Sequence, residues 1–268
     1  MEPFEKADER DLLIINEWTK LNEQLIAGIT TRHGGVSSAP FRSMNLGFHV
    51  PDNHEDVLVN RQIISRQLQI PLEKWVMGQQ THGTSVAIVS DQDAGRGAKN
   101  QIDSISGVDG LITNEKGLLC TAMFADCVPV YFFDPKTGWI GIAHAGWRGT
   151  VNQIVVQVIN SLVEQGSHLR DVMVVIGPCI GKHAYEVDKN VIDHIPDSYK
   201  PNVVTRKTNG HYLLDLRQLN KDILMDLGLE EKNIAVSQYC TYEDQMFFSH
   251  RRDQGLTGRM LGFVGYKV

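Results

Sequence analysis

The chain has 268 residues, with 26 Lys or Arg against 32 Asp or Glu, which gives a formal net charge of −6. A chain of this length can bury a proper hydrophobic core, so neither a disulfide nor a structural metal is needed for folding alone. The acidic balance and the lack of any Lys/Arg cluster argue against a nucleic-acid partner, because binding to nucleic acid rests largely on neutralising phosphates.

Cysteine usage and the N-terminal sequence bear on location. The chain lacks a C-x-x-C pair, and its cysteines are widely spaced: Cys120, Cys127, Cys179 and Cys240. Since secreted disulfide scaffolds are denser in cysteine, we expect a reduced, cytoplasmic protein. The start, MEPFEKADERDLLII, lacks the basic and apolar regions of a signal peptide. The most apolar stretch, residues 117–133, contains Asp126 and Pro129 and is too short to span a membrane. We therefore expect no membrane partner, and the oligomeric state stays open.

The first half of the chain predicts three strands and one helix. The strands are expected at residues 24–31, 76–80 and 85–90. Residues 55–70 carry apolar side chains near helical spacing, and Asp52 or Asn53 is a suitable N-cap for that helix. Residues 91–107 form the longest polar stretch, which is typical either of a binding loop or lid or of a disordered segment.

The second half is richer in β-forming residues. Strands are expected at residues 108–114, 118–133, 139–143, 172–176, 234–237 and 260–268. Residues 150–164 form the clearest helix, with Thr150 as its N-cap, and residues 216–227 form another. Strands and helices mix without strict βαβ alternation, and no linker divides residues 1–268. We therefore predict one domain of the α/β class (mixed α+β), with a mixed, partly antiparallel sheet flanked by helices.

A predicted hairpin carries the first chemical signal. The β-rich runs VPVYFFD and WIGIAHAG flank a Pro-Lys-Thr-Gly turn sequence. A hairpin folded about this turn places Cys127 opposite His144 or Ala145, where facing Cβ atoms lie about 4.5–5.5 Å apart. His82, in a glycine-bearing loop, is the best candidate for a third metal ligand. Two histidines and a cysteine with an open position are typical of catalytic zinc. The alternative is a buried thiol near an ordinary hydrogen-bonded histidine.

The second signal follows His144 in the sequence Ala-Gly-Trp-Arg-Gly-Thr, which leads into the predicted helix. Arginine and glycine at a helix N-terminus are suited to anion binding, so Arg148, Gly149 and Thr150 are candidate phosphate ligands. Arg32, in TRHGGVS, is another candidate for substrate or phosphate binding. The P-loop pattern is absent, and a tight turn with a solvated arginine is the alternative interpretation.

Two further residues have both a functional and a structural interpretation. Asp126, beside Cys127, is suited to proton transfer or to orienting a ligating histidine, but it could equally cap a turn. Cys179 follows a predicted strand at a position where ligands often bind, although a lone cysteine is more often structural. The polar residues 249–253 (SHRRD) indicate a solvated loop.

Several motifs resemble the YfiH/laccase-domain family. They are QTHG at residues 80–83, ADCVPV at 125–130, HAGWRGT at 144–150 and GPCIG at 177–181. TRHGGVS, NLGFHV at residues 45–50, Asn60-Arg61 and the C-terminal GRM also fit, so the resemblance covers nearly the whole chain. Proteins of that family have been labelled polyphenol oxidases, purine nucleoside phosphorylases and peptidoglycan editing factors.

The resemblance implies a single YfiH-like catalytic domain and a mononuclear zinc (Zn²⁺) held by His82, Cys127 and His144. It also implies phosphorolysis of adenosine, inosine and methylthioadenosine, and hydrolytic deamination of adenosine, with purine nucleosides and phosphate as the partners. On this interpretation the catalytic residues are Asp126, Cys127 and Arg148. Substrate and phosphate contacts are then expected from Arg32, Arg148, Gly149 and Thr150.

The histidine pattern argues against one of the other activities that the family labels name. Among ten histidines no two are separated by a single residue, whereas multicopper oxidases typically use His-x-His pairs. A copper-dependent polyphenol oxidase is therefore disfavoured, although Cu²⁺ would bind one His₂Cys site adventitiously. The H-x-E and P-C-x-x-C signature of zinc nucleobase deaminases is also absent. Two alternatives stay open: a hydrolase that edits cell-wall precursor peptides, and a metal-binding module without enzymatic activity.

Overall fold

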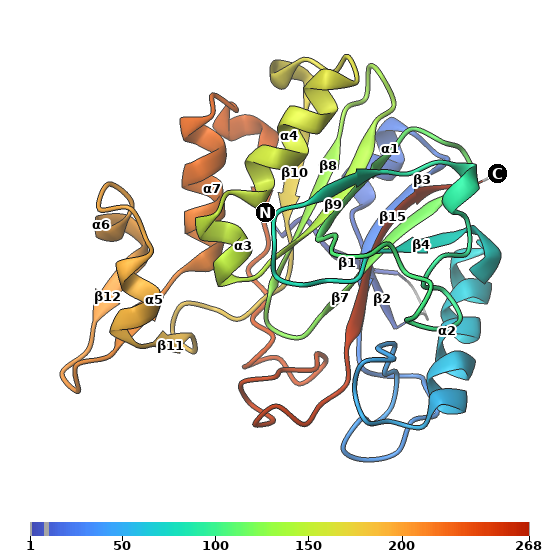
Figure 1. Cartoon of the computed structure of the whole chain (residues 1–268), viewed down its shortest axis with the longest axis horizontal. Coiled ribbons are helices and arrows are strands. Elements are labelled where there is room, and N and C mark those ends of the chain that lie inside the picture. Colours follow the sequence, from blue (N-terminus) through green and yellow to red (C-terminus); the bar gives the residue numbers. More distant parts are fainter. Residues whose placement is uncertain (1, 8–10, 268) are drawn as a thin grey trace.

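Two six-stranded sheets stack face to face at the centre of the molecule (Figure 1). The computed structural model describes residues 2–7 and 11–267. The first sheet has the order β1 (Glu5–Lys6), β2 (Leu12–Ile14), β3 (Leu25–Thr30), β15 (Met260–Tyr266), β7 (Leu119–Phe124), β4 (Trp75–Met77). The second has the order β14 (Ile234–Val236), β10 (Met173–Ile176), β8 (Val128–Phe133), β9 (Ile140–Ala145), β6 (Gly110–Thr113), β5 (Val86–Ile88). A small third sheet contains β11 (Glu186–Val187), β13 (Tyr212–Leu214) and β12 (Val204–Arg206).

Both large sheets are mixed. The pairs β4–β7, β5–β6 and β10–β14 are parallel, and the other neighbours in these two sheets are antiparallel. Strand β8 shows why its sequence is apolar throughout: Tyr131 and Phe133 face the other sheet, whereas Val130 and Phe132 face a layer of helices. Because both faces of this strand are covered, its sequence lacks the usual alternation of apolar and polar residues.

Helices cover the outer faces of the two sheets. The apolar faces of α4 (Ile154–Glu164) and α7 (Leu216–Asp226) pack on the second sheet, and α2 (His54–Leu68) packs on the first. Four shorter helices are α1 (Asn16–Leu21), α3 (Trp147–Val151), α5 (Lys189–Asp193) and α6 (Lys200–Val203). The predicted class, a mixed α/β fold with a partly antiparallel sheet flanked by helices, is confirmed. None of the helices in the described residues is both long and apolar enough to cross a bilayer.

Two predicted elements can be compared closely with the structure. Helix α2 begins as expected, since the Asn53 side chain accepts hydrogen bonds from the backbone N–H groups of Glu55 and Asp56. The prediction that Thr150 is the N-cap of the next helix is wrong. Thr150 lies inside α3, which begins after Gly146. The left-handed backbone of Gln153, with φ of 64°, then breaks the helical path before α4.

Asn60 and Arg61, on the buried face of α2, hold loops that the sequence left unassigned. The Asn60 amide nitrogen donates to Ser37 Oγ and to the carbonyl oxygens of Ser43 and Asn45, at 2.9–3.1 Å. Arg61 reaches the polar 91–107 stretch by donating to the carbonyl oxygens of Gly97 and Ala98. That stretch is therefore a folded loop held against the helix.

We expect Asn60→Ala to lower the free energy of unfolding by about 2–3 kcal/mol, because it leaves buried backbone groups without partners. Urea denaturation measures the effect. The matched control is Gln62→Ala, an exposed position of the same helix, which we expect to change stability by less than about 0.5 kcal/mol. Equal stability of the two variants would contradict the role given to Asn60.

Candidate metal centre

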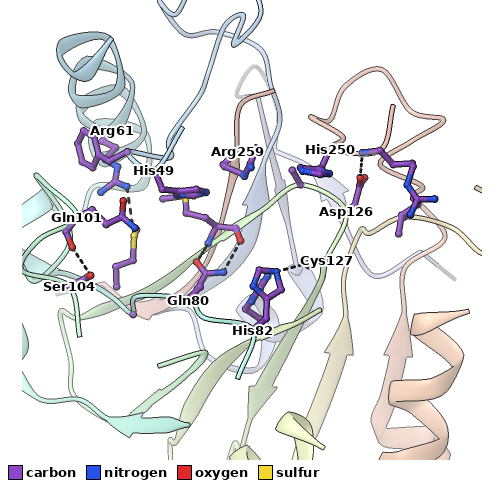
Figure 2. A pocket seen from close by; sticks show the side chains of 18 of the residues that line it. His49, Arg61, Gln80, His82, Gln101, Ser104, Asp126, Cys127, His250 and Arg259 are labelled. Carbon is purple, nitrogen blue, oxygen red and sulfur yellow. Dashed lines mark hydrogen bonds between the residues drawn. The ribbon is translucent and has the colours of Figure 1, made fainter. Parts of the chain in front are cut away.

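The three predicted metal ligands come together at one end of the two sheets. His82 lies in the loop between β4 and β5, Cys127 in the turn between β7 and β8, and His144 near the end of β9. Their ligand atoms all lie within 4.8 Å of one another. The Cys127 Sγ atom is 3.9 Å from His82 Nε2 (Figure 2). Across the described residues, this is the one group of three or more His, Cys, Asp or Glu side chains placed to hold a metal ion.

The hairpin that carries two of these ligands has a different register from the predicted one. Val128 pairs with Ala145, and Pro129 pairs with His144. The same register carried one residue further sets Cys127 across from Gly146, so the predicted pairing of Cys127 with His144 or Ala145 is wrong. The observed pairs are centred between Lys136 and Thr137, in the middle of the Pro-Lys-Thr-Gly turn, so the predicted pairing was displaced from the true turn centre. Cys127 and His144 still share one face, because residues two apart on a strand point the same way.

Gly146 leaves the space that the cluster occupies. A Cβ atom at this position would lie 2.8 Å from His82 Cδ2 and 3.2 Å from Cys127 Sγ. Any side chain here would therefore displace the imidazole of His82. The third ligand, which comes from a different segment, enters the cluster through the gap left by this glycine.

Asp109 joins two of the three ligands. Its Oδ1 atom is 2.8 Å from Nδ1 of the buried His144 and also accepts the backbone N–H of His82 at 3.0 Å. Its Oδ2 atom accepts the N–H groups of Thr81 and Gly83. One buried carboxylate thus orients the ring of one ligand and shapes the loop that carries another. That loop bends sharply, with φ of 62° at His82.

Sequence reasoning missed Asp109, although a signal was present. It stands inside the predicted strand 108–114, where every other side chain but the last two is apolar or absent. A carboxylate in such a strand is costly to bury unless it has partners.

The charges within the cluster favour a metal cation. Burial alone would raise the pKa of Cys127, but the adjacent His144 and His82 lower the pKa to about 6. Burial alone would lower the pKa of His144, but Cys127 and Asp109 raise the pKa to about 9. At neutral pH the metal-free site thus pairs a thiolate with an imidazolium, and a cation can replace that proton between the same groups.

The donor set fits zinc. Bonds of about 2.0–2.3 Å in a tetrahedron place neighbouring ligand atoms roughly 3.3–3.8 Å apart, so the observed spacing needs only a small contraction. A histidine ligand whose second nitrogen meets a carboxylate, as His144 does with Asp109, is the usual support for such a site.

A pocket of about 430 Å³ opens next to the cluster. Besides the three ligands, its lining includes polar and charged side chains that sequence reasoning did not single out: His49, Arg61, Gln80, Gln101, Ser104, Tyr185, His250, Arg251 and Arg259. Gln101 and Ser104 come from the 91–107 stretch, which therefore serves as a pocket-lining loop. The signal for four of the others lay in the motifs described above: His49 in NLGFHV, Arg61 in Asn60-Arg61, Gln80 in QTHG and Arg259 in GRM.

The other sequence-predicted residues divide between the pocket and its surroundings. Asp126 lines the pocket, and its two carboxylate oxygens accept hydrogen bonds from Thr241 Oγ1 at 2.6 Å and from the Arg251 N–H at 2.7 Å. Arg148 is exposed and lies over the Trp147 ring, outside the lining of this pocket. Arg32 lies over the Phe248 ring.

Three more predicted positions have structural contacts. A Cβ atom at Gly149 would lie 3.1 Å from the carbonyl oxygen of Gly83, so a side chain here would crowd that loop. The Thr150 hydroxyl accepts a hydrogen bond from the Asn220 amide at 3.0 Å. Cys179 is buried in the helix-covered core, where its backbone pairs with that of Cys240 in an isolated parallel β-bridge.

We expect Asp109→Asn to weaken zinc binding about 10–100-fold, because the amide cannot accept the same three N–H groups while meeting His144. Competition with a chelator measures the affinity. Asp134→Asn is the matched control, since Asp134 is equally buried and accepts backbone N–H groups at the opposite end of the same hairpin. Equal zinc affinities in the two variants would contradict the role of Asp109.

In protein stripped of metal, we expect iodoacetamide at pH 7 to modify Cys127 before the other cysteines, because its lowered pKa leaves it mostly as the thiolate. Cys120 and Cys179 serve as internal controls, since burial raises the pKa of each to about 12. Peptide mass spectrometry gives the order of labelling. Added zinc should protect Cys127, and labelling that is unchanged by zinc would argue against its role as a ligand.

Known proteins are similar to this chain along nearly its whole length. The family model described as multi-copper polyphenol oxidoreductase laccase matches residues 26–267. A Bacillus subtilis protein named purine nucleoside phosphorylase YlmD is 43% identical over 262 residues, which cover 95% of this chain and 94% of that protein. A protein of Staphylococcus saprophyticus named purine nucleoside phosphorylase SSP1584 is 37% identical. The alignment covers 96% of this chain and 97% of that protein.

Solved structures agree with the sequence matches. The hypothetical protein YfiH of Bacillus licheniformis and YlmD of Geobacillus stearothermophilus each superpose with a TM-score of 0.94 at 40% identity, with both chains covered completely. This chain therefore belongs to the multi-copper polyphenol oxidoreductase laccase family, the YfiH/laccase-domain family that its motifs resemble.

Proposed function

We propose that this protein is a zinc-dependent purine nucleoside phosphorylase that also deaminates adenosine. The observation that carries the proposal is the His82–Cys127–His144 cluster in the wall of a pocket of about 430 Å³, a size typical of small-molecule sites. Its relatives in Bacillus subtilis and Staphylococcus saprophyticus bear the name purine nucleoside phosphorylase. The proposed substrates are adenosine, inosine and methylthioadenosine, and the proposed location is the cytoplasm.

Zinc is the proposed cofactor, held by His82, Cys127 and His144. When bound, zinc would supply a Lewis acid beside the substrate and lower the pKa of water. Cu²⁺ would compete for the same donors. The single cluster within the described residues favours zinc over the several centres of a multicopper oxidase.

Asp126 contributes through the loop that it holds. Both its oxygens are engaged, one by Thr241 and the other by the backbone of Arg251. Its backbone φ of 89° turns the chain just before Cys127. These contacts support a positioning role in which Asp126 keeps His250 and Arg251 at the pocket edge. Proton transfer by Asp126, as predicted from the sequence, would first require one of these hydrogen bonds to open.

Tyr185 is a candidate for orienting the nucleoside. Its ring lines the pocket beneath the Arg251 guanidinium, 5.2 Å away. Burial is the main cause that raises the pKa of Tyr185 well above its usual range, so the phenol keeps its proton and can donate it in a hydrogen bond. Apolar side chains of Met77, Met123 and Ile180 line the same pocket and offer a surface for a purine ring.

The test is an assay of zinc-loaded protein with adenosine, in the presence and absence of phosphate, with adenine, hypoxanthine and inosine resolved by chromatography. We expect adenine release that depends on phosphate and inosine formation that does not. Cys127→Ala should lose both activities together with its zinc, whereas Cys120→Ala, a buried cysteine in the core between the sheets, should keep both.

Two further arms separate the alternatives. Cell-wall precursor peptides test the editing hydrolase, and a catechol with copper-loaded protein tests the polyphenol oxidase. If neither phosphate-dependent base release nor inosine is formed, the proposed function fails, and a positive result in another arm then replaces it.

A further inference from the structure

Two motifs from opposite ends of the chain meet beside the metal centre. The N–H of Arg259 donates to the side-chain oxygen of Asn45 at 2.9 Å, and the N–H of Leu46 donates to the carbonyl oxygen of Arg259 at 3.1 Å. The same Asn45 oxygen accepts the N–H of Gly47. The start of strand β15 is thereby fixed against the loop that leads to His49.

Gly47 leaves room for both side chains. A Cβ atom at Gly47 would lie 2.8 Å from Arg259 Cγ and 3.1 Å from His49 Cε1. The aliphatic part of Arg259 and the imidazole of His49 therefore both pack closely against Gly47, and both side chains line the pocket. Figure 2 shows Arg259 between His49 and His250.

The hydrogen-bond partners of the Arg259 guanidinium are neutral. Its Nη1 atom donates to the carbonyl oxygens of Thr257 and Gly258. Within the described residues, no carboxylate lies within ion-pair distance of Arg259. Its remaining N–H groups are thus available to a ligand in the pocket.

A second cation without an ion pair lies deeper in the same wall. Arg61 is 1% exposed, and its hydrogen-bond partners are backbone carbonyl oxygens and the sulfur of Met77. Among the described residues that line the pocket, the one carboxylate is Asp126, and both its oxygens are taken. The arginines of the lining, Arg61, Arg251 and Arg259, thus outnumber its one carboxylate, which acts on Arg259 without forming an ion pair with it.

His49 stays neutral between these cations. Burial, and then the positive charges of Arg259 and Arg61, lower the pKa of His49 to about 4. A neutral imidazole can donate one N–H and leaves its other nitrogen as an acceptor. It can therefore donate to an unprotonated oxygen of a hydrogen phosphate or accept from its P–OH group.

We propose that Arg259 and His49 bind the inorganic phosphate of phosphorolysis, with Arg61 behind them as a fixed positive charge. This inference rests on the proposed function. In the reaction, a phosphate oxygen forms a bond to ribose C1′ while the bond from C1′ to the purine nitrogen breaks. The bonding electron pair leaves with the purine, which takes up the phosphate's proton, and the products are ribose 1-phosphate and the free base. The site therefore requires an anion pocket beside the nucleoside.

The first experiment measures the binding of inorganic phosphate to zinc-loaded protein without nucleoside, by calorimetry. We expect Arg259→Gln to weaken binding at least about tenfold, because it removes a charge-assisted pair of donors. Arg259→Lys keeps the positive charge but loses the paired N–H groups of the guanidinium, so its phosphate affinity should lie between that of Arg259→Gln and that of the wild type. Arg206→Gln, an exposed arginine on β12, is the matched control and should bind phosphate as the wild type does.

The second experiment separates phosphate binding from a general loss of structure. In the phosphorolysis assay, Arg259→Gln should raise KM for phosphate at least about tenfold and change KM for the nucleoside by less than threefold, with its zinc content unchanged. If Arg259→Gln does not fold, KM for phosphate and KM for the nucleoside are compared in Arg259→Lys and in Gly47→Ala instead. The alanine at position 47 pushes the aliphatic part of Arg259 out of place.

The outcomes distinguish the two proposals. Phosphate affinity in Arg259→Gln within twofold of the wild type would overturn the inference, as would a loss confined to Arg148→Gln, the position expected from the sequence. If the wild type binds phosphate through Arg259 but cleaves none of the nucleosides, the anion site stands and the proposed function fails.

Discussion

The hydrogen bonds of one buried carboxylate organise the candidate metal centre. Asp109 fixes the ring of His144 through Nδ1 and gathers three consecutive N–H groups of the loop that carries His82. Without it, those N–H groups would lose their common acceptor, and the left-handed backbone at His82 would lose its support. A candidate ligand from a loop and a candidate ligand from a strand are thus held to a common geometry by a residue outside the candidate ligand set.

The stacking of the two sheets explains why the pocket forms where it does. Strands β4 and β7 of the first sheet and β9 and β10 of the second end on this side, where β8 and β15 begin. Six segment ends therefore meet at one edge of the molecule, and each leads into a turn or loop. The core between the sheets fixes their relative position, so side chains that are distant in sequence can share one small cavity.

Much of this arrangement could be predicted from residue patterns. The apolar spacing after Asn53 indicated α2, and the two β-rich runs indicated the hairpin that carries Cys127 and His144. The register followed from the centre of the Pro-Lys-Thr-Gly turn, between Lys136 and Thr137, but the predicted pairing was displaced from that centre. The helix break at Gln153 was also hidden, since neither glycine nor proline marks it. Contacts such as Arg259 with Asn45 join residues more than two hundred positions apart, and no local pattern records them.

The unequal exposure of the ligands has a kinetic consequence. His144 lies at 4% exposure in the sheet, whereas His82 is exposed at its edge. A metal ion can then enter or leave through rotation of the outer imidazole alone, while the inner ligand and its carboxylate stay in place. Local opening of this kind costs far less free energy than unfolding. Metal exchange should accordingly proceed in the folded protein, at a rate set by the loop rather than by the stability of the core.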